Sequence, residues 1–346
     1  MLDGDASTIR KLLEVIVKAQ IRNTLLIGDD YRIVLHISAR SAILSFFQGL
    51  SRGRGVPMAL VQDYICASVP HAIEQAGAII HCYPLGKTLV PDEKELDSLI
   101  EENSPDVVLF SPIFGAQGEA YDRQIKKWSE ADGGPIIVLD QAQFMGPLSC
   151  RPEAVILSFH NKSIDSMNGG ALLLHQSFHG CKPPPSRDIG INKEFYLAIL
   201  FRSLRKGRSK VGEVNEVVQP GFAYDDSQYF PDKIENAKMP LVSMLIIIAE
   251  MMKLEHYLEI RRYNFQKLRQ RIEKIPGAHI VLTENVDTAA RFPIRFDDDD
   301  SLSQVTRSLA EVGIRVGRPY SRYDDPSSSS RPGLYSVANP FHRIGP

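Results

Sequence analysis

The stretch that decides the fold runs from Pro135 to Leu174 and reads PIIVLDQAQFMGPLSCRPEAVILSFHNKSIDSMNGGALLL. It holds three short apolar runs, which are Pro135–Leu139, Ala154–Leu157 and Ala171–Leu174. Short runs rich in Ile, Val and Leu are typical of strands that are buried on both faces of a sheet. The stretch therefore predicts three buried strands.

Polar residues stand where these runs end. Asp140 and Gln143 follow the first run, Ser158 and Lys162 follow the second, and Gly169–Gly170 precede the third. In an open α/β sheet ligands bind at the ends of strands, so these side chains are expected to converge on one edge. An acid, an amide, a hydroxyl and a lysine beside two glycines suit pyridoxal phosphate (PLP). The lysine would form the Schiff base, and the acid would keep the pyridine nitrogen protonated.

The same residues carry a family resemblance. The pattern Asp-x-x-Gln at Asp140–Gln143, the segment Ser158–Lys162 and the pair Gly169–Gly170 resemble the signature of the DegT-type sugar aminotransferases. Between Ser158 and Lys162 this chain is one residue shorter than the usual pattern. The resemblance implies fold type I of the PLP-dependent enzymes, an α/β fold with a mostly parallel central sheet and a smaller C-terminal α/β domain. The implied division is a large PLP-binding domain at 1–235 and a small domain at 236–346.

The resemblance also implies an activity and its partners. The chain would transfer an amino group from an amino acid, glutamate or glutamine, to a keto-sugar or a related keto substrate. Lys162 would hold PLP and move the α-proton as a general acid–base. Asp140 would stabilise the pyridinium, and Gln143 would contact the phenolic oxygen of the ring. Ser158 is a further PLP-binding position, and the family works as a homodimer.

Two further family positions belong to the cofactor site. The turn Ser38-Ala39-Arg40 stands where the family binds the cofactor phosphate with a Ser-Gly-Thr-like turn, and the start of a helix there suits an anion. An ordinary helix start is the alternative interpretation. The family stacks an aromatic side chain on the pyridine ring where this chain has Cys66, with Tyr64 two residues away. Either Tyr64 stacks on the ring, or it is a structural tyrosine.

The family's Asn-x-Arg-Met element reaches the phosphate bound in the partner subunit. Here Asn236-Ala237-Lys238-Met239 matches it, with Lys238 in place of Arg, which keeps the charge but not the bidentate fork. The alternative is that Asn236 caps the following helix within its own subunit. The turn Ser111–Gly115 resembles a wall of the family's site.

The rest of the chain alternates strands with helices, which favours a mostly parallel sheet with helices on both faces. The other strands expected before residue 175 are Arg32–Ile37, Met58–Gln62, Ala78–Cys82 and Asp106–Phe110. The helices expected there are Ala6–Ala19, Ser38–Phe47, Ser68–Gln75, Asp92–Glu102 and Tyr121–Ala131. The later helices expected are Asn192–Leu204, one long helix at Leu241–Lys274, and Ser301–Val312. The later strands are Ala278–Leu282, Ala289–Phe296 and Ile314–Val316. A basic surface run is expected at Arg202–Lys210, and loops at Val217–Asp232 and Ser327–Ser330. The acids Asp297–Asp300 are expected to cap that last helix rather than to bind a metal.

Composition excludes several classes of function. The chain has 346 residues, 43% of them hydrophobic, and a formal net charge of −2, so it lacks the basic footprint of a nucleic-acid-binding protein. Four cysteines show neither a CxxC motif nor a zinc-ligand spacing. No apolar run approaches the ~20 residues of a membrane span, and the N-terminus is acidic where a signal peptide is basic. We expect a cytoplasmic protein.

Alternatives of two kinds remain at this point. The first is another PLP reaction on the same scaffold, such as racemisation, elimination or decarboxylation, since a fold does not fix its chemistry. The second is a degenerate relative that acts as a structural or regulatory subunit. Some members of the family replace the lysine with histidine and are dehydratases, and Lys162 argues against that branch. The visible absorbance of bound PLP would separate a catalytic protein from a degenerate one.

Overall fold

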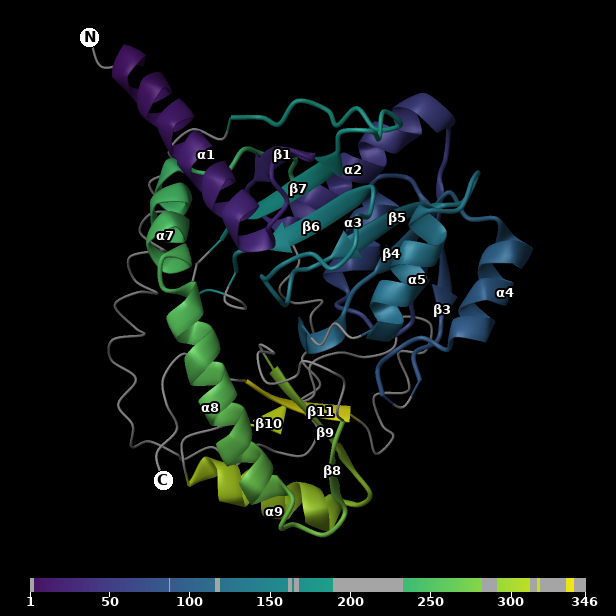
Figure 1. Cartoon of the computed structure of the whole chain (residues 1–346), viewed down its shortest axis with the longest axis vertical. Helices are drawn as coiled ribbons and strands as arrows, with labels where there is room; N and C mark the ends of the chain where they lie inside the picture. The colour runs from purple at the N-terminus through teal and green to yellow at the C-terminus, as the bar shows by residue number, and fades with distance from the viewer. Residues whose placement is uncertain are drawn as a thin grey trace.

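The computed structural model describes residues 3–86, 88–115, 119–160, 164, 168–188, 233–281, 291–311, 316–317 and 334–338. Within these residues seven strands form the central sheet, in the order β1-β7-β6-β5-β4-β2-β3 (Figure 1). Their bounds are β1 (Tyr31–His36), β2 (Met58–Gln62), β3 (Ile79–Tyr83), β4 (Val107–Phe110), β5 (Ile136–Asp140), β6 (Ala154–Ser158) and β7 (Gly170–His175).

The sheet is mostly parallel, as the sequence predicts. Strand β2 pairs in parallel with β3 and β4, β4 pairs with β5, and β5 pairs with β6. Strand β7 runs antiparallel to both β6 and β1. Strand β1 therefore points in the same direction as β6, and the carboxyl ends of all strands except β7 meet at one edge of the sheet.

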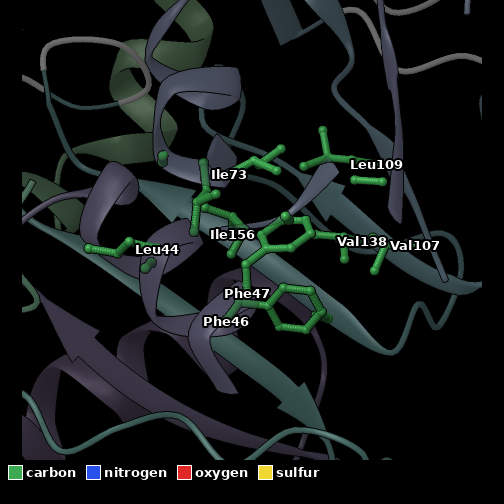
Figure 2. Packing of buried hydrophobic residues seen from close by; sticks show 14 of the residues in the cluster. Leu44, Phe46, Phe47, Ile73, Val107, Leu109, Val138 and Ile156 are labelled. Carbon is green, nitrogen blue, oxygen red and sulfur yellow. The ribbon is translucent and has the colours of Figure 1, made fainter. Parts of the chain in front are cut away.

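Helices cover both faces of the sheet. On one face, α2 (Ala39–Arg54) and α3 (Ser68–Gln75) pack against alternate strand residues such as Val107 and Leu109. Phe47 of α2 belongs to the same core (Figure 2). The residues between these, such as Val108 and Phe110, pack on the opposite face under α4 (Glu93–Asn103) and α5 (Glu119–Ser129). Alternation of buried side chains on both faces explains why these strands are continuous apolar runs.

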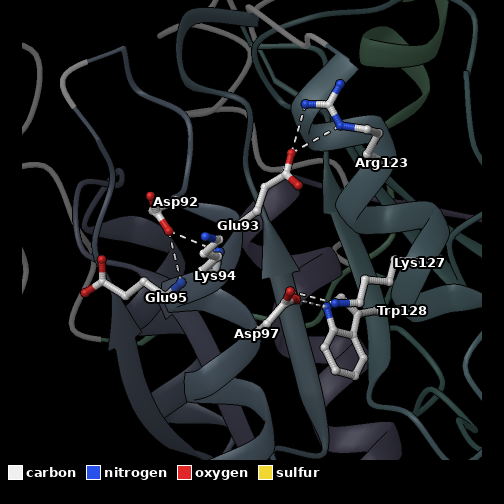
Figure 3. A network of polar contacts seen from close by, with 8 residues as sticks. All are labelled: Asp92, Glu93, Lys94, Glu95, Asp97, Arg123, Lys127 and Trp128. Carbon is white, nitrogen blue, oxygen red and sulfur yellow. Dashed lines mark hydrogen bonds and ion pairs between the residues drawn. The ribbon is translucent and has the colours of Figure 1, made fainter.

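Polar contacts tie α4 to α5 on the outside of that face (Figure 3). Arg123 donates to a Glu93 carboxylate oxygen at 2.9 Å, and Asp97 accepts from the Lys127 ammonium at 2.6 Å and from the Trp128 indole at 3.1 Å. Exposed ion pairs of this kind contribute about 1 kcal/mol or less each. They set the relative register of two helices whose attachment comes from the apolar core beneath them.

The remaining helices lead away from the sheet. Helix α1 (Asp3–Leu25) packs beside α7 (Leu241–Met251), and α8 (Leu254–Ile272) runs from there to a second, smaller sheet (Figure 1). The sequence predicted one helix over Leu241–Lys274, and this prediction is wrong. The chain turns at Lys253, whose N–H bonds to the Glu250 carbonyl three residues back and whose ψ is 0°.

The break has a tertiary cause. Helix α7 buries Met244 and Ile247 in the core that α1 shares with β1, β6 and β7. The second half of α8 buries Phe265, Leu268 and Ile272 in the separate core of the small sheet. Two cores in different places require two helix directions, and no proline or glycine in the sequence marks the point of change.

The small sheet has the strand order β10-β11-β9-β8 in the part of the chain that the structure describes. Its elements are β8 (Ala278–Ile280), β9 (Arg291–Phe296), α9 (Asp299–Ala310), β10 (Val316–Gly317) and β11 (Leu334–Ala338). Asp298 caps α9 by accepting from the N–H of Ser301 at 2.7 Å, as expected for the acidic run. The sequence did not predict β11, a short strand that is held between β9 and β10.

Several predicted elements lie outside the described residues. They are the helix Asn192–Leu204, the basic run Arg202–Lys210, and the loops Val217–Asp232 and Ser327–Ser330. Among the helices that are described, none combines the length and the apolar character needed to cross a membrane.

Candidate active site

The carboxyl edge of the central sheet gathers several polar residues, and the sequence singled out some of them. Each of them ends a strand or directly follows one, and the strands concerned are neighbours or near neighbours in the sheet. These residues are Gln62 at the end of β2, Ser111 after β4, Asp140 at the end of β5, Ser158 at the end of β6 and Ser38 after β1. Gly170, the first residue of antiparallel β7, pairs with Ser158 and lies at the same edge.

Asp140 is the buried acid of this edge, and only 4% of its surface is exposed. The hydroxyl of Ser111 donates to Asp140 Oδ2 at 3.0 Å, and the N–H of Ala142 donates to Oδ1 at 3.0 Å. Hydrogen bonds donated to a carboxylate favour its ionised form. For an ionised carboxylate at this place, a cationic N–H is the complementary partner.

The N-terminus of α2 lies at the same carboxyl edge of the sheet as Asp140. Ser38 is its N-cap and accepts from the N–H of Ser41 at 3.2 Å, and the first turn, which includes Ala39 and half-buried Arg40, contains no acidic residue. A helix N-terminus carries a partial positive charge and directs its N–H groups outward, so it favours an anion. The structure thus bears out a helix start at the predicted phosphate turn.

Gly170 allows β7 to touch this turn. A Cβ at Gly170 would lie 2.3 Å from the N atom of Ala39 and 2.4 Å from the carbonyl carbon of Ser38. Its neighbour Gly169 has φ +117° and donates its N–H to the Ile37 carbonyl at 2.8 Å. The close backbone contacts at Gly170 admit no side chain, and the positive φ at Gly169 favours glycine.

Asn236 belongs to a segment that crosses the same region. Its side chain accepts from the Ser186 hydroxyl at 3.0 Å and donates to the Pro184 carbonyl at 3.3 Å, so it is held by the connector of its own chain. It does not cap α7, whose N-cap is Pro240. Lys238 is exposed and lies 3.9 Å from the Asp188 carboxylate.

Gln143 and the turn after β4 form a further wall. Gln143 is buried, and a Cβ on Gly115 (φ +83°) would come within 2.7 Å of its carbonyl oxygen and 2.9 Å of Phe144 Cβ. The turn Ile113–Gly115 therefore packs directly on the segment that follows Asp140. That the turn Ser111–Gly115 is a wall of a cofactor site stays a prediction.

Tyr64 and Cys66 both lie in the loop between β2 and α3, and both are half-buried. Tyr64 packs against the apolar core under α4 and α5, and its carbonyl accepts from the Gln62 amide at 3.0 Å. Cys66 Sγ lies 3.1 Å from the Ser68 hydroxyl at the start of α3. Which of them faces a ring stays a prediction.

Lys162 lies outside the described residues, so the structure does not test its position. The described chain approaches it through Ser158, whose hydroxyl accepts from the N–H of His160 at 3.4 Å, and continues at buried Ile164.

Sequence reasoning missed two buried polar residues at this edge, Gln62 and His36, and it gave Ser111 only as part of a wall. The available signal was the one already used for Asp140, since Gln62 and His36 are polar ends of apolar strands. Burial lowers the pKa of His36 to about 4, partly offset by the Asn236 side chain, so the imidazole is neutral at physiological pH.

The residues present fit PLP. The buried carboxylate of Asp140, with two donors that favour its ionised form, matches a protonated pyridine nitrogen, and the α2 N-terminus matches a phosphate. The fit rests on these two groups, because an acid and a helix N-terminus with a partial positive charge lie at the same edge of the sheet.

Comparison with known proteins gives the fold its context. The sequence matches no protein-family model, and a search of curated proteins finds no match. Solved structures do match. Helicobacter pylori PseC, an aminotransferase of pseudoaminic acid biosynthesis, aligns with a TM-score of 0.63 and 14% identity over 94% of this chain and 85% of its own.

Two other solved structures are similar over most of their length. A DegT DnrJ EryC1 StrS aminotransferase from Brucella abortus has a TM-score of 0.58 and 14% identity, with 98% of this chain and 92% of that chain covered. The GDP-4-keto-6-deoxymannose-3-dehydratase ColD has a TM-score of 0.62 and 17% identity, with 98% and 93% covered. This chain therefore has the α/β fold of the fold-type-I PLP-dependent enzymes, the fold on which sugar aminotransferases are built.

Proposed function

We propose that this chain is a PLP-dependent aminotransferase that moves an amino group from an amino acid, glutamate or glutamine, to a keto-sugar or a related keto substrate. The observation that carries the proposal is the buried Asp140 carboxylate with its two donors, at the same sheet edge as the α2 N-terminus. The shared fold with PseC and with the Brucella aminotransferase supports it.

PLP, when bound, supplies an electron sink that allows a proton to leave the α-carbon of an amino acid. The residues of this chain would hold and orient it. Asp140 keeps the ring nitrogen protonated, because an adjacent carboxylate favours the cation in a poorly solvated site. The first turn of α2, from Ser38 to Arg40, would bind the phosphate. Gln143 would contact the phenolic oxygen of the ring.

Lys162 would attach the cofactor covalently and then carry a proton to and from the α-carbon of the substrate. Ser158 stands at the end of β6, just before the segment that contains it. A lysine rather than a histidine at this position favours amino-group transfer over dehydration, the reaction for which ColD is named.

Cysteine usage supports a cytoplasmic location. The structure shows no disulfide at Cys66, Cys82, Cys150 or Cys181. Free thiols persist in the reducing cytoplasm, whereas secreted proteins tend to pair them. We place the reaction in that compartment.

A homodimer is part of the proposal. Helix α1 exposes three apolar side chains on one side, Ile9, Leu12 and Val15, each more than half exposed. Its neighbour α7 exposes Leu245, and Met252 follows directly. Apolar side chains gathered on adjacent helices are typical of protein interfaces.

The first experiment locates the cofactor. Borohydride reduction of the PLP-loaded protein, followed by peptide mapping, should place the pyridoxyl adduct on Lys162, and Lys162→Ala should remove it. An adduct on a different lysine contradicts the assignment. A panel of amino acids should then convert bound PLP to its amino form, with glutamate or glutamine the fastest. A protein that binds no PLP would instead be a degenerate relative.

A further inference from the structure

The side chain of Ser111 forms a hydrogen bond with the Asp140 carboxylate. Its hydroxyl lies 3.0 Å from Asp140 Oδ2, and 3% of Ser111 and 4% of Asp140 are exposed. An ionised carboxylate only accepts, so the hydroxyl is the donor. Hydrogen bonds to charged groups are short and strong, and exclusion of water strengthens them further.

Ser111 is itself held in place by Gln62. The N–H of Ser111 donates to Gln62 Oε1 at 3.2 Å, and Gln62 is fully buried at the end of β2. Gln62 Nε2 donates to the Tyr64 carbonyl at 3.0 Å. One amide thus joins the turn that carries Ser111 to the loop that carries Tyr64 and Cys66.

The hydrogen bonds also determine which way the Gln62 amide points. Oε1 faces two donors, the Ser111 N–H and the Tyr83 hydroxyl at 3.4 Å, while Nε2 faces a carbonyl. Tyr83 lies closer to the Leu109 carbonyl, at 3.1 Å, so that carbonyl is its main acceptor. If the Gln62 amide were reversed, its Nε2 hydrogens would point at the N–H of Ser111.

We propose that Ser111 is a positioning residue for Asp140, and that Gln62 fixes Ser111 relative to the loop at residues 63–66. The inference rests on the proposed function, because it assigns a role to the support of the same acid. Ser111 holds one carboxylate oxygen and Ala142 holds the other. The carboxylate is then fixed in orientation at both of its oxygens.

The other ionisable groups packed at this point act in different ways. Asp63 is buried, and its Oδ1 accepts from the Leu85 N–H at 3.1 Å. Burial raises the pKa of Tyr83 well above its usual range, with smaller contributions from Tyr121 and Asp63, so its phenol is neutral. Neither Tyr83 nor Asp63 carries a positive charge, so neither could stabilise the Asp140 carboxylate in place of the Ser111 hydroxyl.

The test compares Ser111→Ala, Ser111→Thr and the control Ser45→Ala. Ser45 is equally buried, and its hydroxyl has no hydrogen-bond partner in the described structure. In the full chain prepared without PLP, ¹³C NMR of the aspartate carboxyls follows the titration of Asp140, with Asp140→Asn assigning the signal. Ser111→Ala should raise the midpoint by about one pH unit, since a charge-assisted hydrogen bond is lost.

The conservative variant and the control make the outcome specific. Ser111→Thr keeps the hydroxyl and should restore most of the shift, and Ser45→Ala should leave the midpoint in place. An unchanged midpoint in Ser111→Ala, or an equal shift in Ser45→Ala, overturns the proposal. This titration needs no cofactor. A failure of PLP binding would therefore refute the proposed function, but it would not change the result of the titration.

A second measurement uses the PLP-loaded protein. Ser111→Ala should slow the donor-dependent conversion of the cofactor by about tenfold at saturating donor, with little change in KM for the donor, because the lost contact acts on the reacting ring. Gln62→Met removes the anchor of Ser111, so its effect on that rate should be less than additive with that of Ser111→Ala. Full additivity would contradict the coupling through Gln62.

Discussion

Asp140 is the last residue of β5, and its carboxylate lies between a hydroxyl from the neighbouring strand's turn and a backbone N–H two residues ahead. Burial alone would favour the protonated acid, whereas donated hydrogen bonds favour the ionised one. The two donors therefore favour the ionised form of Asp140 and fix the direction of its carboxylate. Two predictions belong to this scale, one for Asp140 and one for His36.

Asp140→Asn should preserve the fold but slow the donor half-reaction by roughly 10²–10³-fold, as the loss of a preorganised electrostatic group commonly does. Single-turnover absorbance measures it. The matched control is Asp106→Asn, since Asp106 is also a carboxylate that accepts from a backbone N–H, that of Met58 at 2.8 Å, but just before β4 at the opposite edge of the sheet. A loss below about tenfold for Asp140→Asn would count against its role.

His36 should make the folded protein sensitive to acid. Burial lowers its pKa from 6.5 to about 4 in the folded state, so between those values the unfolded chain binds more protons. Stability is therefore lost as the pH falls through this window. The shift corresponds to about 3 kcal/mol. His36→Leu should lose less unfolding free energy than the wild type between pH 6.5 and 4 in urea titrations, and equal losses would contradict the prediction.

At the scale of elements, the contact between β7 and the N-terminus of α2 decides the geometry of the turn at Ser38–Arg40, which is predicted to bind the phosphate. Gly170 pairs with Ser158 on one side and His36 on the other, and its Cα faces the Ser38–Ala39 backbone. A strand and a helix end meet here without any side chain between them. The position of α2 relative to the acid on β5 thus depends on one residue without a Cβ.

Gly170→Ala should therefore displace the α2 N-terminus, because its Cβ would meet backbone atoms at 2.3–2.6 Å. We expect a loss of several-fold or more in PLP affinity and a lowered urea midpoint. Gly53→Ala is the control, since its Cβ has nothing closer than 3.9 Å and alanine favours a helix interior by about 0.5–1 kcal/mol. Equal behaviour of the two variants would show that close packing at Gly170 is unimportant.

At the scale of the whole molecule, two cores are joined by α7 and α8. The large sheet carries the acid and the phosphate turn, and the small sheet packs against α8 and reaches the turn at Ile113–Gly115 through β9. Val281, just after β8, is buried in the core under α4 and α5. The boundary near residue 235 stays a prediction, but the small unit does contact the wall of the site.

The proposed homodimer makes a prediction about shared sites. A mixture of Lys162→Ala and Asn236→Ala subunits should regain activity above either defective parent, because one site of a mixed two-fold dimer then carries both defects and the other carries none. Sedimentation with differently tagged subunits confirms the mixing. A confirmed mixed dimer without recovery would assign Asn236 to its own subunit, where Ser186 and Pro184 already hold its side chain.

The sequence by itself determined the central sheet. Continuous apolar runs and turn signals located its strands to within a residue or two, and the polar residues that end them lie together at the carboxyl edge. β2 falls on Met58–Gln62 as predicted, and Asp140 differs only in being the last residue of its strand. Local patterns suffice here because a strand buried on both faces must be apolar throughout and can be polar only where it ends.

Only the tertiary structure decided the rest. The division of Leu241–Lys274 into α7 and α8 depends on two cores that are far apart in space, and β11 exists because β9 and β10 pair with it from both sides. The Ser111 hydroxyl on Asp140 joins residues 29 positions apart, and the Gln62 amide on Ser111 joins residues 49 apart. Contacts of this kind leave no periodicity in a sequence, because they arise from the order of strands in the sheet.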